Sequence, residues 1–187
     1  MKYQINEVYR SYQGEGFRTG TENVFVRFTG CNLRCQMKAG PKSPGDFDCD
    51  TEFMSGRAMT MGSLLGWIQQ EDGLHGRTPC RWVILTGGEP GLQVDETLID
   101  ALHDIGFQIA IETNGSILLP AGLDYISVSP KVAEHCIKQT KADEVRYVRG
   151  YGQSLPKTAV NAQHKFISPA FVGDTLEKRT LDWCTEL

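Results

Sequence analysis

Short apolar runs rich in β-favouring residues recur along the chain, and several are nearly continuous in apolar residues rather than alternating with polar ones. Continuous runs of this length are typical of strands with both faces covered, as in a parallel sheet. We therefore expect strands at residues 3–9, 24–28, 82–85, 107–111, 125–128, 145–148 and 164–167.

Helical spacing of apolar residues occurs between some of these runs. Residues 61–68 follow the i, i+3, i+4, i+7 pattern of an amphipathic helix, and Thr60 precedes them as an N-cap. A second apolar stripe occupies residues 98–105, and a third helix is expected from about residue 176 to the end. Strands that alternate with helices predict an α/β architecture with right-handed crossovers.

The small number of helices limits the choice of α/β fold. A complete eight-fold barrel needs about 200 residues or more, whereas this chain has 187. We therefore expect a partial (open) TIM-like barrel of parallel strands with few covering helices. We also expect a single domain over residues 1–187, with an inserted loop at about 36–48, where two glycines, two prolines and no periodicity are found.

Composition and charge exclude several classes of partner. Hydrophobic residues make up 40% of the chain and charged residues 22%, as in ordinary globular proteins. The formal net charge of −4 and the lack of a basic run argue against nucleic acid or an anionic membrane as a partner. No apolar run approaches the roughly 18 residues of a membrane-spanning helix, and residues 1–7 lack the apolar core of a signal peptide. We therefore expect a cytoplasmic protein.

Six cysteines divide into one cluster and three scattered residues. Cys31, Cys35 and Cys49 lie within 19 residues of each other, directly after the strand expected at 24–28. Clustered cysteines in a reducing compartment indicate metal binding or catalysis rather than disulfides. The scattered ones are expected to be small buried core residues: Cys80, Cys136 and Cys184.

The three neighbouring thiols suit a cubane iron–sulfur cluster. Three thiolates bind three irons and leave the fourth open to a substrate or cofactor. Structural zinc normally takes four ligands, in paired knuckles that this segment lacks, although Asp46 or Asp48 would be available as a fourth. From spacing alone, an iron–sulfur cluster, zinc and no metal all stay open.

A second motif, Thr86-Gly87-Gly88-Glu89-Pro90, follows the strand expected at 82–85. With three cysteines after one strand and Gly-Gly-Glu-Pro after the next, the sequence resembles the radical S-adenosylmethionine (SAM) enzymes. The resemblance implies that SAM chelates the open iron and that Glu89 meets its ammonium group. An electron from the reduced cluster then cleaves SAM to a 5′-deoxyadenosyl radical, so the cofactor carries the difficult chemistry.

Four further segments narrow the resemblance to the 7-carboxy-7-deazaguanine synthase family, from about residue 3 to about residue 183. They are Ser11-Tyr12-Gln13-Gly14-Glu15-Gly16, Cys49-Asp50-Thr51, Glu112-Thr113-Asn114-Gly115 and Ser129-Pro130-Lys131. The resemblance implies a ring contraction of 6-carboxy-5,6,7,8-tetrahydropterin to 7-carboxy-7-deazaguanine with loss of ammonia, in deazapurine (queuosine-type) biosynthesis. It also implies a 4Fe–4S cluster, SAM and Mg²⁺ as cofactors.

Matching the family's motifs position by position assigns the site residues that the resemblance implies. The cluster would be held by Cys31, Cys35 and Cys49, and Mg²⁺ by the hydroxyl of Thr51. The pterin substrate would be bound by Gln13, Gly14, Glu15, Arg27 and Thr86, with Arg27 pairing with its carboxylate. SAM would be bound by Asp50, Gly88, Glu89, Asn114, Ser129, Pro130 and Lys131.

The same resemblance implies partners, and two other functions compete with it. A flavodoxin- or ferredoxin-like reductant and a homodimer are expected. One rival is a radical SAM activase of a glycyl-radical enzyme, which would not need the Gln13-Gly14-Glu15 segment. The other is a non-catalytic metal-binding or electron-transfer module, which would leave Gly-Gly-Glu-Pro without a task. The thirteen residues between Cys35 and Cys49 depart from the usual two, so the loop at 36–48 has no role that the family explains.

Overall fold

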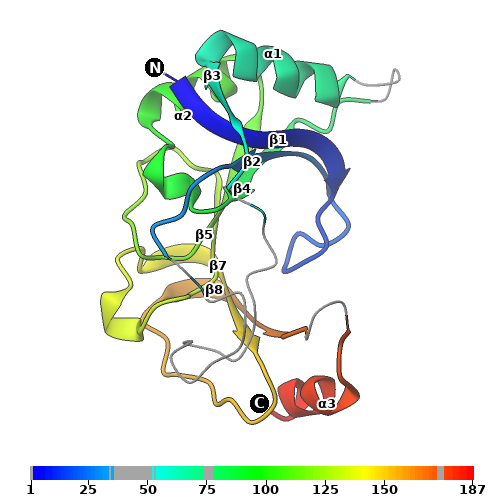
Figure 1. Cartoon of the computed structure of the whole chain (residues 1–187), viewed down its shortest axis with the longest axis vertical. Helices are drawn as coiled ribbons and strands as arrows, with labels where there is room; N and C mark the ends of the chain where they lie inside the picture. Colours follow the sequence, from blue (N-terminus) through cyan, green and yellow to red (C-terminus); the bar gives the residue numbers. More distant parts are fainter. Residues whose placement is uncertain (1, 34, 36–51, 53, 74–77, 172–174) are drawn as a thin grey trace.

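The computed structural model describes residues 2–33, 35, 52, 54–73, 78–171 and 175–187. Within these residues, eight strands form one open sheet in the order β3-β1-β2-β4-β5-β6-β7-β8 (Figure 1). The strands are β1 (Lys2–Tyr12), β2 (Glu22–Phe28), β3 (Arg57–Thr60), β4 (Trp82–Gly87), β5 (Gln108–Thr113), β6 (Tyr125–Val128), β7 (Lys141–Arg149) and β8 (Asn161–Pro169). The expected open, partial barrel with few helices is confirmed.

The strand directions are mixed rather than all parallel. From β2 through β4 to β8 each neighbouring pair is parallel, but β1 pairs antiparallel with both β2 and β3. The reason lies in the connection from β1 to β2, where Gln13 N–H donates to Thr21 O at 2.8 Å and Gly20 N–H donates to Gln13 O at 2.8 Å. Such a short hairpin joins only antiparallel strands.

Three α-helices are described, and two of them cover one face of the sheet. They are α1 (Met61–Asp72), α2 (Glu96–Asp104) and α3 (Lys178–Glu186); two short 3₁₀ helices are η2 (Pro90–Leu92) and η3 (Glu134–Cys136). Thr60 caps α1 as expected, accepting from Ser63 N–H. Helices α1 and α2 lie together at one end of the molecule and α3 at the other (Figure 1). No helix in the described part of the chain is long and apolar enough to cross a membrane.

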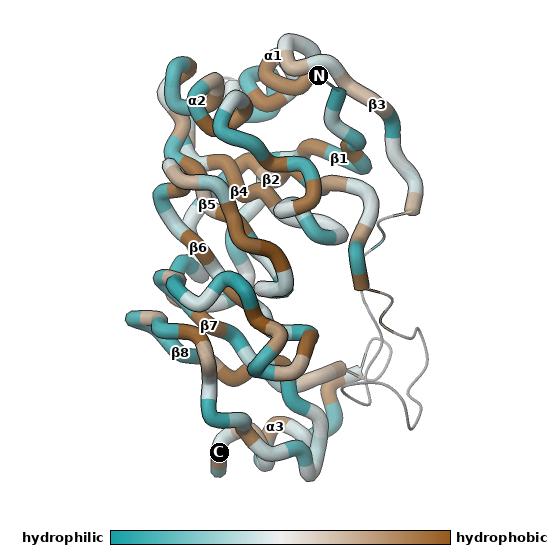
Figure 2. The backbone as a smooth tube through the Cα atoms, turned by 90° about the vertical axis from the view of Figure 1, so that its left-hand side faces the viewer, coloured by the Kyte–Doolittle hydropathy of each residue, from teal (hydrophilic) through white to brown (hydrophobic). Residues whose placement is uncertain are grey.

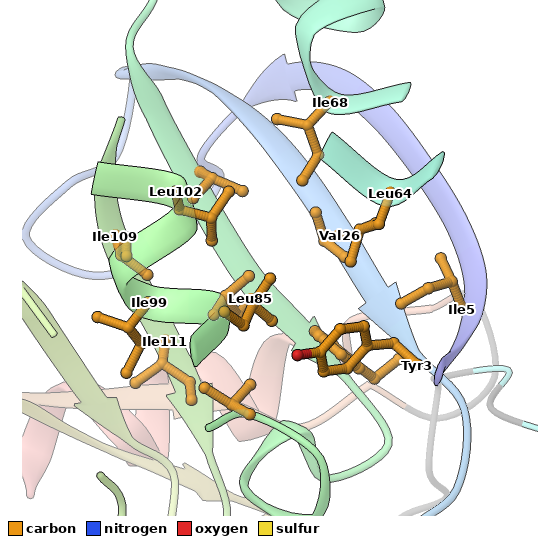
Figure 3. Packing of buried hydrophobic residues seen from close by; sticks show 14 of the residues in the cluster. Tyr3, Ile5, Val26, Leu64, Ile68, Leu85, Ile99, Leu102, Ile109 and Ile111 are labelled. Carbon is orange, nitrogen blue, oxygen red and sulfur yellow. The ribbon is translucent and has the colours of Figure 1, made fainter. Parts of the chain in front are cut away.

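The main core lies between α1, α2 and the sheet. Leu64 and Ile68 of α1 pack with strand residues such as Val26 and Leu85, and all four side chains are fully buried (Figure 3). Figure 2 shows hydrophobic segments on β2, β4 and β5, the strands that supply many of the core residues. Successive residues of a strand point to opposite faces, so the alternate residues of these strands are left to line the concave inner face.

The inner face carries a small apolar patch and many polar side chains. Phe25, Ile84 and Ala110 form the patch, with Tyr9, Trp82 and Tyr125 packed against it. Next to it are the charged residues of the site described below.

The burial expected for the scattered cysteines is wrong for one of them. Cys136 is exposed, and Cys80 and Cys184 are partly buried. Cys136 belongs to η3, which has no buried residue, and its neighbours Glu134, His135 and Lys138 are polar.

Candidate active site

The cofactor side of the site lies where the parallel strands end. Strands β2, β4, β5 and β6 are neighbours, so their carboxyl ends share one edge of the sheet, where ligands of open parallel sheets bind. Backbone hydrogen bonds tie the loops there: Gly88 N–H donates to Phe28 O at 3.0 Å and Glu89 N–H to Gly30 O at 2.9 Å. Ser129 N–H donates to Thr113 O at 2.8 Å. The fold thus brings the Gly-Gly-Glu-Pro, Asn114 and Ser129 segments to the cysteine loop.

Cys31 and Cys35 are partly exposed cysteines on the loop after β2 and form no disulfide. Leu33 N–H donates to Cys31 Sγ at 3.4 Å, and the side chain of Asn114 reaches Asn32 Oδ1 at 3.2 Å and Cys31 Sγ at 4.0 Å. Accessible thiols that accept from N–H groups fit ligands of an iron–sulfur cluster, because such donors stabilise the thiolate and tune the cluster.

Part of the predicted cofactor site lies outside the described residues. This holds for Cys49, Asp50 and Thr51 and for the inserted loop expected at 36–48. Among the residues that are described, no three His, Cys, Asp or Glu side chains form a group that could hold a metal ion. The three-cysteine ligand set and the Mg²⁺ ligand Thr51 therefore stay predictions.

Glu89 is buried, and its carboxylate already has protein partners. Its exposed fraction is 0%. Oε1 accepts from Gly91 N–H at 3.0 Å and from the Thr113 hydroxyl at 2.8 Å, and Oε2 accepts from Asn114 N–H at 2.7 Å. Burial raises the pKa of Glu89 above its usual value, against the lowering effect of these donors. The carboxylate joins the ends of β4 and β5, and contact with the SAM ammonium stays a prediction.

Ser129, Pro130 and Lys131 follow β6 on the same edge. Lys131 Nζ donates to Ser129 Oγ at 3.2 Å, and all three residues are partly buried. Their position beside the Asn114 segment agrees with a shared cofactor pocket.

The substrate side of the site centres on a buried arginine that the sequence reasoning did not single out. Arg146 of β7 is 5% exposed. Its Nη2 lies 3.0 Å from Glu112 Oε1, its Nε lies 3.0 Å from Glu144 Oε1, and its Nη1 pairs with Glu15. Burial opposes its charge, but the carboxylates of Glu112, Glu15 and Glu144 together raise its pKa above the usual value.

Three of the predicted substrate residues meet at this arginine cluster. Gln13 Nε2 donates to Glu112 Oε1 at 2.9 Å, Thr86 Oγ1 donates to Glu112 Oε2 at 2.8 Å, and Glu15 pairs with Arg146. Two of the three, Gln13 and Glu15, also line a small inner-face cavity, whose other lining residues are Arg18, Ile84, Ala110, Ile111, Glu112, Tyr125, Ser127 and Glu144.

Arg27 and Gly14 complete the predicted substrate set. Arg27 sits opposite Thr86 in the β2–β4 register, with Nε 2.7 Å from Glu7 Oε1 and Nη2 3.1 Å from the Tyr9 hydroxyl. Its side chain keeps 23% of its surface exposed, so it is within reach of a ligand. Gly14 is exposed, and a Cβ built on it would meet no atom within 4 Å.

Glu112, Glu144 and Arg146 are the site residues that sequence reasoning missed. Glu112 opens the quoted Glu-Thr-Asn-Gly segment, although no role was assigned to it. The other two were detectable from strand periodicity, because they alternate with the apolar Val145 and Tyr147. Charges on one face of a strand whose other face is apolar indicate a polar inner surface.

An open parallel sheet with cysteines after its first parallel strand and Gly-Gly-Glu-Pro after the next defines a radical SAM enzyme. No protein-family model matches the chain. Curated relatives do match it over most of their length, and they are 7-carboxy-7-deazaguanine synthases. The one from Bacteroides thetaiotaomicron is 38% identical over 176 residues, which cover 94% of this chain and 86% of that protein.

Two further relatives give the same result. The enzyme from Bradyrhizobium diazoefficiens is 38% identical over 84% of this chain and 77% of its own length. The one from Burkholderia multivorans is 37% identical over 98% of this chain and 91% of its own length. The chain therefore belongs to the 7-carboxy-7-deazaguanine synthase family, which uses a 4Fe–4S cluster and SAM, with Mg²⁺.

A solved structure supports the fold independently. The crystal structure of QueE from Escherichia coli matches with a TM-score of 0.67 at 24% sequence identity. The match covers 100% of this chain and 89% of that one.

Proposed function

We propose that this chain converts 6-carboxy-5,6,7,8-tetrahydropterin to 7-carboxy-7-deazaguanine with loss of ammonia, in the deazapurine (queuosine-type) pathway. The observation that carries the proposal is the meeting of Gln13, Glu15 and Thr86 on the inner face, where they bond to Glu112 and Arg146. These residues come from the β1–β2 turn, β4, β5 and β7, and a protein-activating radical enzyme has no evident use for such an arrangement.

The roles of the substrate residues follow from their chemistry. Ionised carboxylates only accept hydrogen bonds, so Glu15 and Glu112 suit the N–H groups along the amide edge of a pterin. The Gln13 side chain can both donate and accept, which suits the same edge. Arg27, on the neighbouring strand, offers a planar fork for the substrate carboxylate. Its present partner, Glu7, is 47% exposed, so the pair can open at little cost.

The cofactor roles are assigned to the carboxyl edge of the sheet. Cys31, Cys35 and Cys49 hold the 4Fe–4S cluster. SAM lies against Asp50, Gly88, Glu89, Asn114, Ser129, Pro130 and Lys131. When bound and reduced, this pair would supply the radical chemistry of the reaction. The backbone hydrogen bonds of Gly88 and Glu89 to the end of β2 and to Gly30 would hold the cysteine loop in place.

Mg²⁺ is assigned to Thr51, whose hydroxyl oxygen is a hard ligand of the kind this ion prefers. The substrate carboxylate and water complete the oxygen shell. This assignment rests on the family motif Cys49-Asp50-Thr51.

A flavodoxin- or ferredoxin-like reductant supplies the electron, and the chain acts as a homodimer. The dimer is proposed because few helices cover the sheet and because large apolar side chains such as Tyr12 and Phe171 are exposed, at 63% and 55%. Light scattering after size-exclusion chromatography tests the dimer, and a strict monomer would exclude it.

The function is tested with the anaerobically reconstituted protein. Iron and sulfide are loaded, and dithionite, SAM, Mg²⁺ and carboxytetrahydropterin are added; products are followed by mass spectrometry. We expect 7-carboxy-7-deazaguanine from the wild type, and neither this product nor 5′-deoxyadenosine from Cys31→Ala. SAM cleavage without the deazaguanine would keep the radical chemistry and reject the substrate.

A further inference from the structure

The β1–β2 turn, residues 13–17, is held on the inner face by two side chains of β7. Residues 144 and 146 are two apart in a strand, so both project to the inner face. Glu144 is 2% exposed and Arg146 is 5% exposed. Glu144 binds the backbone of the turn, and Arg146 binds one of the turn's side chains, that of Glu15.

Glu144 fixes the backbone of the turn. Its Oε2 accepts from Phe17 N–H at 2.7 Å and from the Tyr125 hydroxyl at 3.0 Å, and its Oε1 accepts from the Ser127 hydroxyl at 3.1 Å. The carboxylate lies so close to Gly16 that a Cβ there would stand 2.1 Å from Oε1, and Gly16 has φ of +69°. Any other residue at this position would have to adopt a left-handed conformation and displace the Glu144 carboxylate from its place beside the turn.

Arg146 fixes the side chains around the cavity. Its two Nη atoms reach Glu15 of the turn and Glu112 of β5, which is also the acceptor for Gln13 and Thr86. Among the described residues, three carboxylates surround this one guanidinium. Without its charge, the buried Glu144 and the half-buried Glu112 would repel one another with little screening, and the Glu15 side chain, which is 62% exposed, would lose the ion pair that holds it on the inner face.

We propose that Arg146 is a positioning residue for substrate binding: it holds Glu15 and Glu112 in their acceptor positions and keeps the 13–17 turn closed on the inner face. The inference rests on the proposed function. Arg146 acts through the two carboxylates, and those carboxylates, rather than Arg146 itself, meet the substrate. The guanidinium suits this task because its rigid fork can bind two carboxylates at once, which a lysine cannot do.

The test compares Arg146→Gln and Arg146→Lys with a matched control, Arg10→Gln. Arg10 is equally buried, with 5% of its side chain exposed, and is paired with Glu22 at 2.8 Å, but it lies on the opposite side of the sheet from the cavity residues. For Arg146→Gln we expect KM for carboxytetrahydropterin to rise by about 10- to 100-fold, as for loss of a charge-assisted pair. We expect kcat to change much less, Arg146→Lys to fall between, and Arg10→Gln to lose thermal stability without a change in KM.

A second readout does not depend on turnover. Amide hydrogen exchange in the segment 13–17 should be faster in Arg146→Gln than in the wild type and unchanged in Arg10→Gln, because only the first variant frees the turn. If the wild-type protein makes no 7-carboxy-7-deazaguanine, the proposed function is rejected. The hydrogen-exchange measurement would still test whether Arg146 holds the 13–17 turn on the inner face. A folded Arg146→Gln with wild-type KM and exchange overturns the inference; if that variant does not fold, the same result for Arg146→Lys overturns it.

Discussion

The substitution Glu89→Gln separates two roles of the Gly-Gly-Glu-Pro segment. In one, the Glu89 carboxylate accepts hydrogen bonds within the protein; in the other, it meets the SAM ammonium. The carboxylate accepts three hydrogen bonds from Gly91, Thr113 and Asn114 and is fully buried. Glutamine has the same shape but replaces one acceptor oxygen by an NH₂ donor. Either orientation of the amide leaves one buried backbone N–H, that of Gly91 or that of Asn114, without an acceptor.

The size of the effect follows from that orphaned donor. An unsatisfied buried polar group costs about 1–3 kcal/mol of folding free energy. For a chain of this size each kcal/mol lowers the melting temperature by about 2–4 °C, so we expect a fall of roughly 2–12 °C. The matched control is Glu134→Gln, because Glu134 also accepts from a hydroxyl and a backbone N–H, those of Tyr147 and Ala159, and belongs to η3, which contributes no residue to the predicted SAM site.

The loss should depend on pH, because burial raises the pKa of Glu89 from its usual 4.5. In the interval between the unfolded and the folded pKa the folded state binds more protons, so the contribution of Glu89 to stability falls as pH rises through the folded pKa. Glutamine does not titrate. The stability gap between wild type and Glu89→Gln should therefore be largest at acid pH and narrow as pH increases.

The assay is thermal unfolding of the anaerobic protein at several pH values, with SAM binding measured alongside. An unchanged melting temperature together with clearly weaker SAM binding would refute the structural reasoning and show that the carboxylate meets the SAM ammonium. A lower melting temperature with unchanged SAM affinity at a temperature where the variant is folded would support it.

Three further substitutions test other parts of the site. Gly16→Ala should destabilise the protein by more than the roughly 1–2 kcal/mol of a left-handed alanine and raise KM, because the new Cβ collides with Glu144; Gly20→Ala, with φ of +85° and no atom near its Cβ, should show only the backbone cost in denaturant unfolding. Arg27→Gln should raise KM for the carboxylated pterin about 10- to 100-fold, as for loss of a charge-assisted bond, while SAM cleavage without substrate stays at the wild-type rate; an unchanged KM would show that Arg27 does not bind the carboxylate. Thr51→Ala should weaken the Mg²⁺ dependence of product formation while SAM cleavage persists, and a wild-type Mg²⁺ titration curve would contradict this role.

The strands were predictable because their apolar runs are long, and the start of α1 because Thr60 has the right chemistry for an N-cap. Strand β3 was missed, since among its four residues only Met59 is buried and no run exists to detect. The direction of β1 was missed as well, because the apolar pattern of 3–9 carries no information on which neighbour the strand meets. That information lies in the hairpin contact between Gln13 and Thr21.

The site was predictable where a local motif carries it and not where distant residues build it. Gln13, Glu15 and Thr86 were predicted from their segments, yet Arg146, which pairs with Glu15, is 131 residues from it in the chain. Spacing along a sequence cannot reveal such a pair. The structural role of Glu89 could not be predicted from the sequence either, because it depends on the hydroxyl and backbone N–H groups that β5 and the loop after it donate to the Glu89 carboxylate.

Strand β2 connects the two halves of the site covalently. The 13–17 turn precedes its first residue, Glu22, and the cysteine loop follows its last, Phe28. Seven residues of strand span about 20 Å, yet the turn folds back over the inner face, so that Gln13 reaches Glu112, and Asn114, two residues further on, lies 4.0 Å from Cys31 Sγ. Segments that leave opposite ends of one strand thus present their side chains to the same region. Lengthening β2 by two residues would keep every side chain on its face but would shift the register of the strand against β1 and β4, and we expect it to carry the turn away from Glu112.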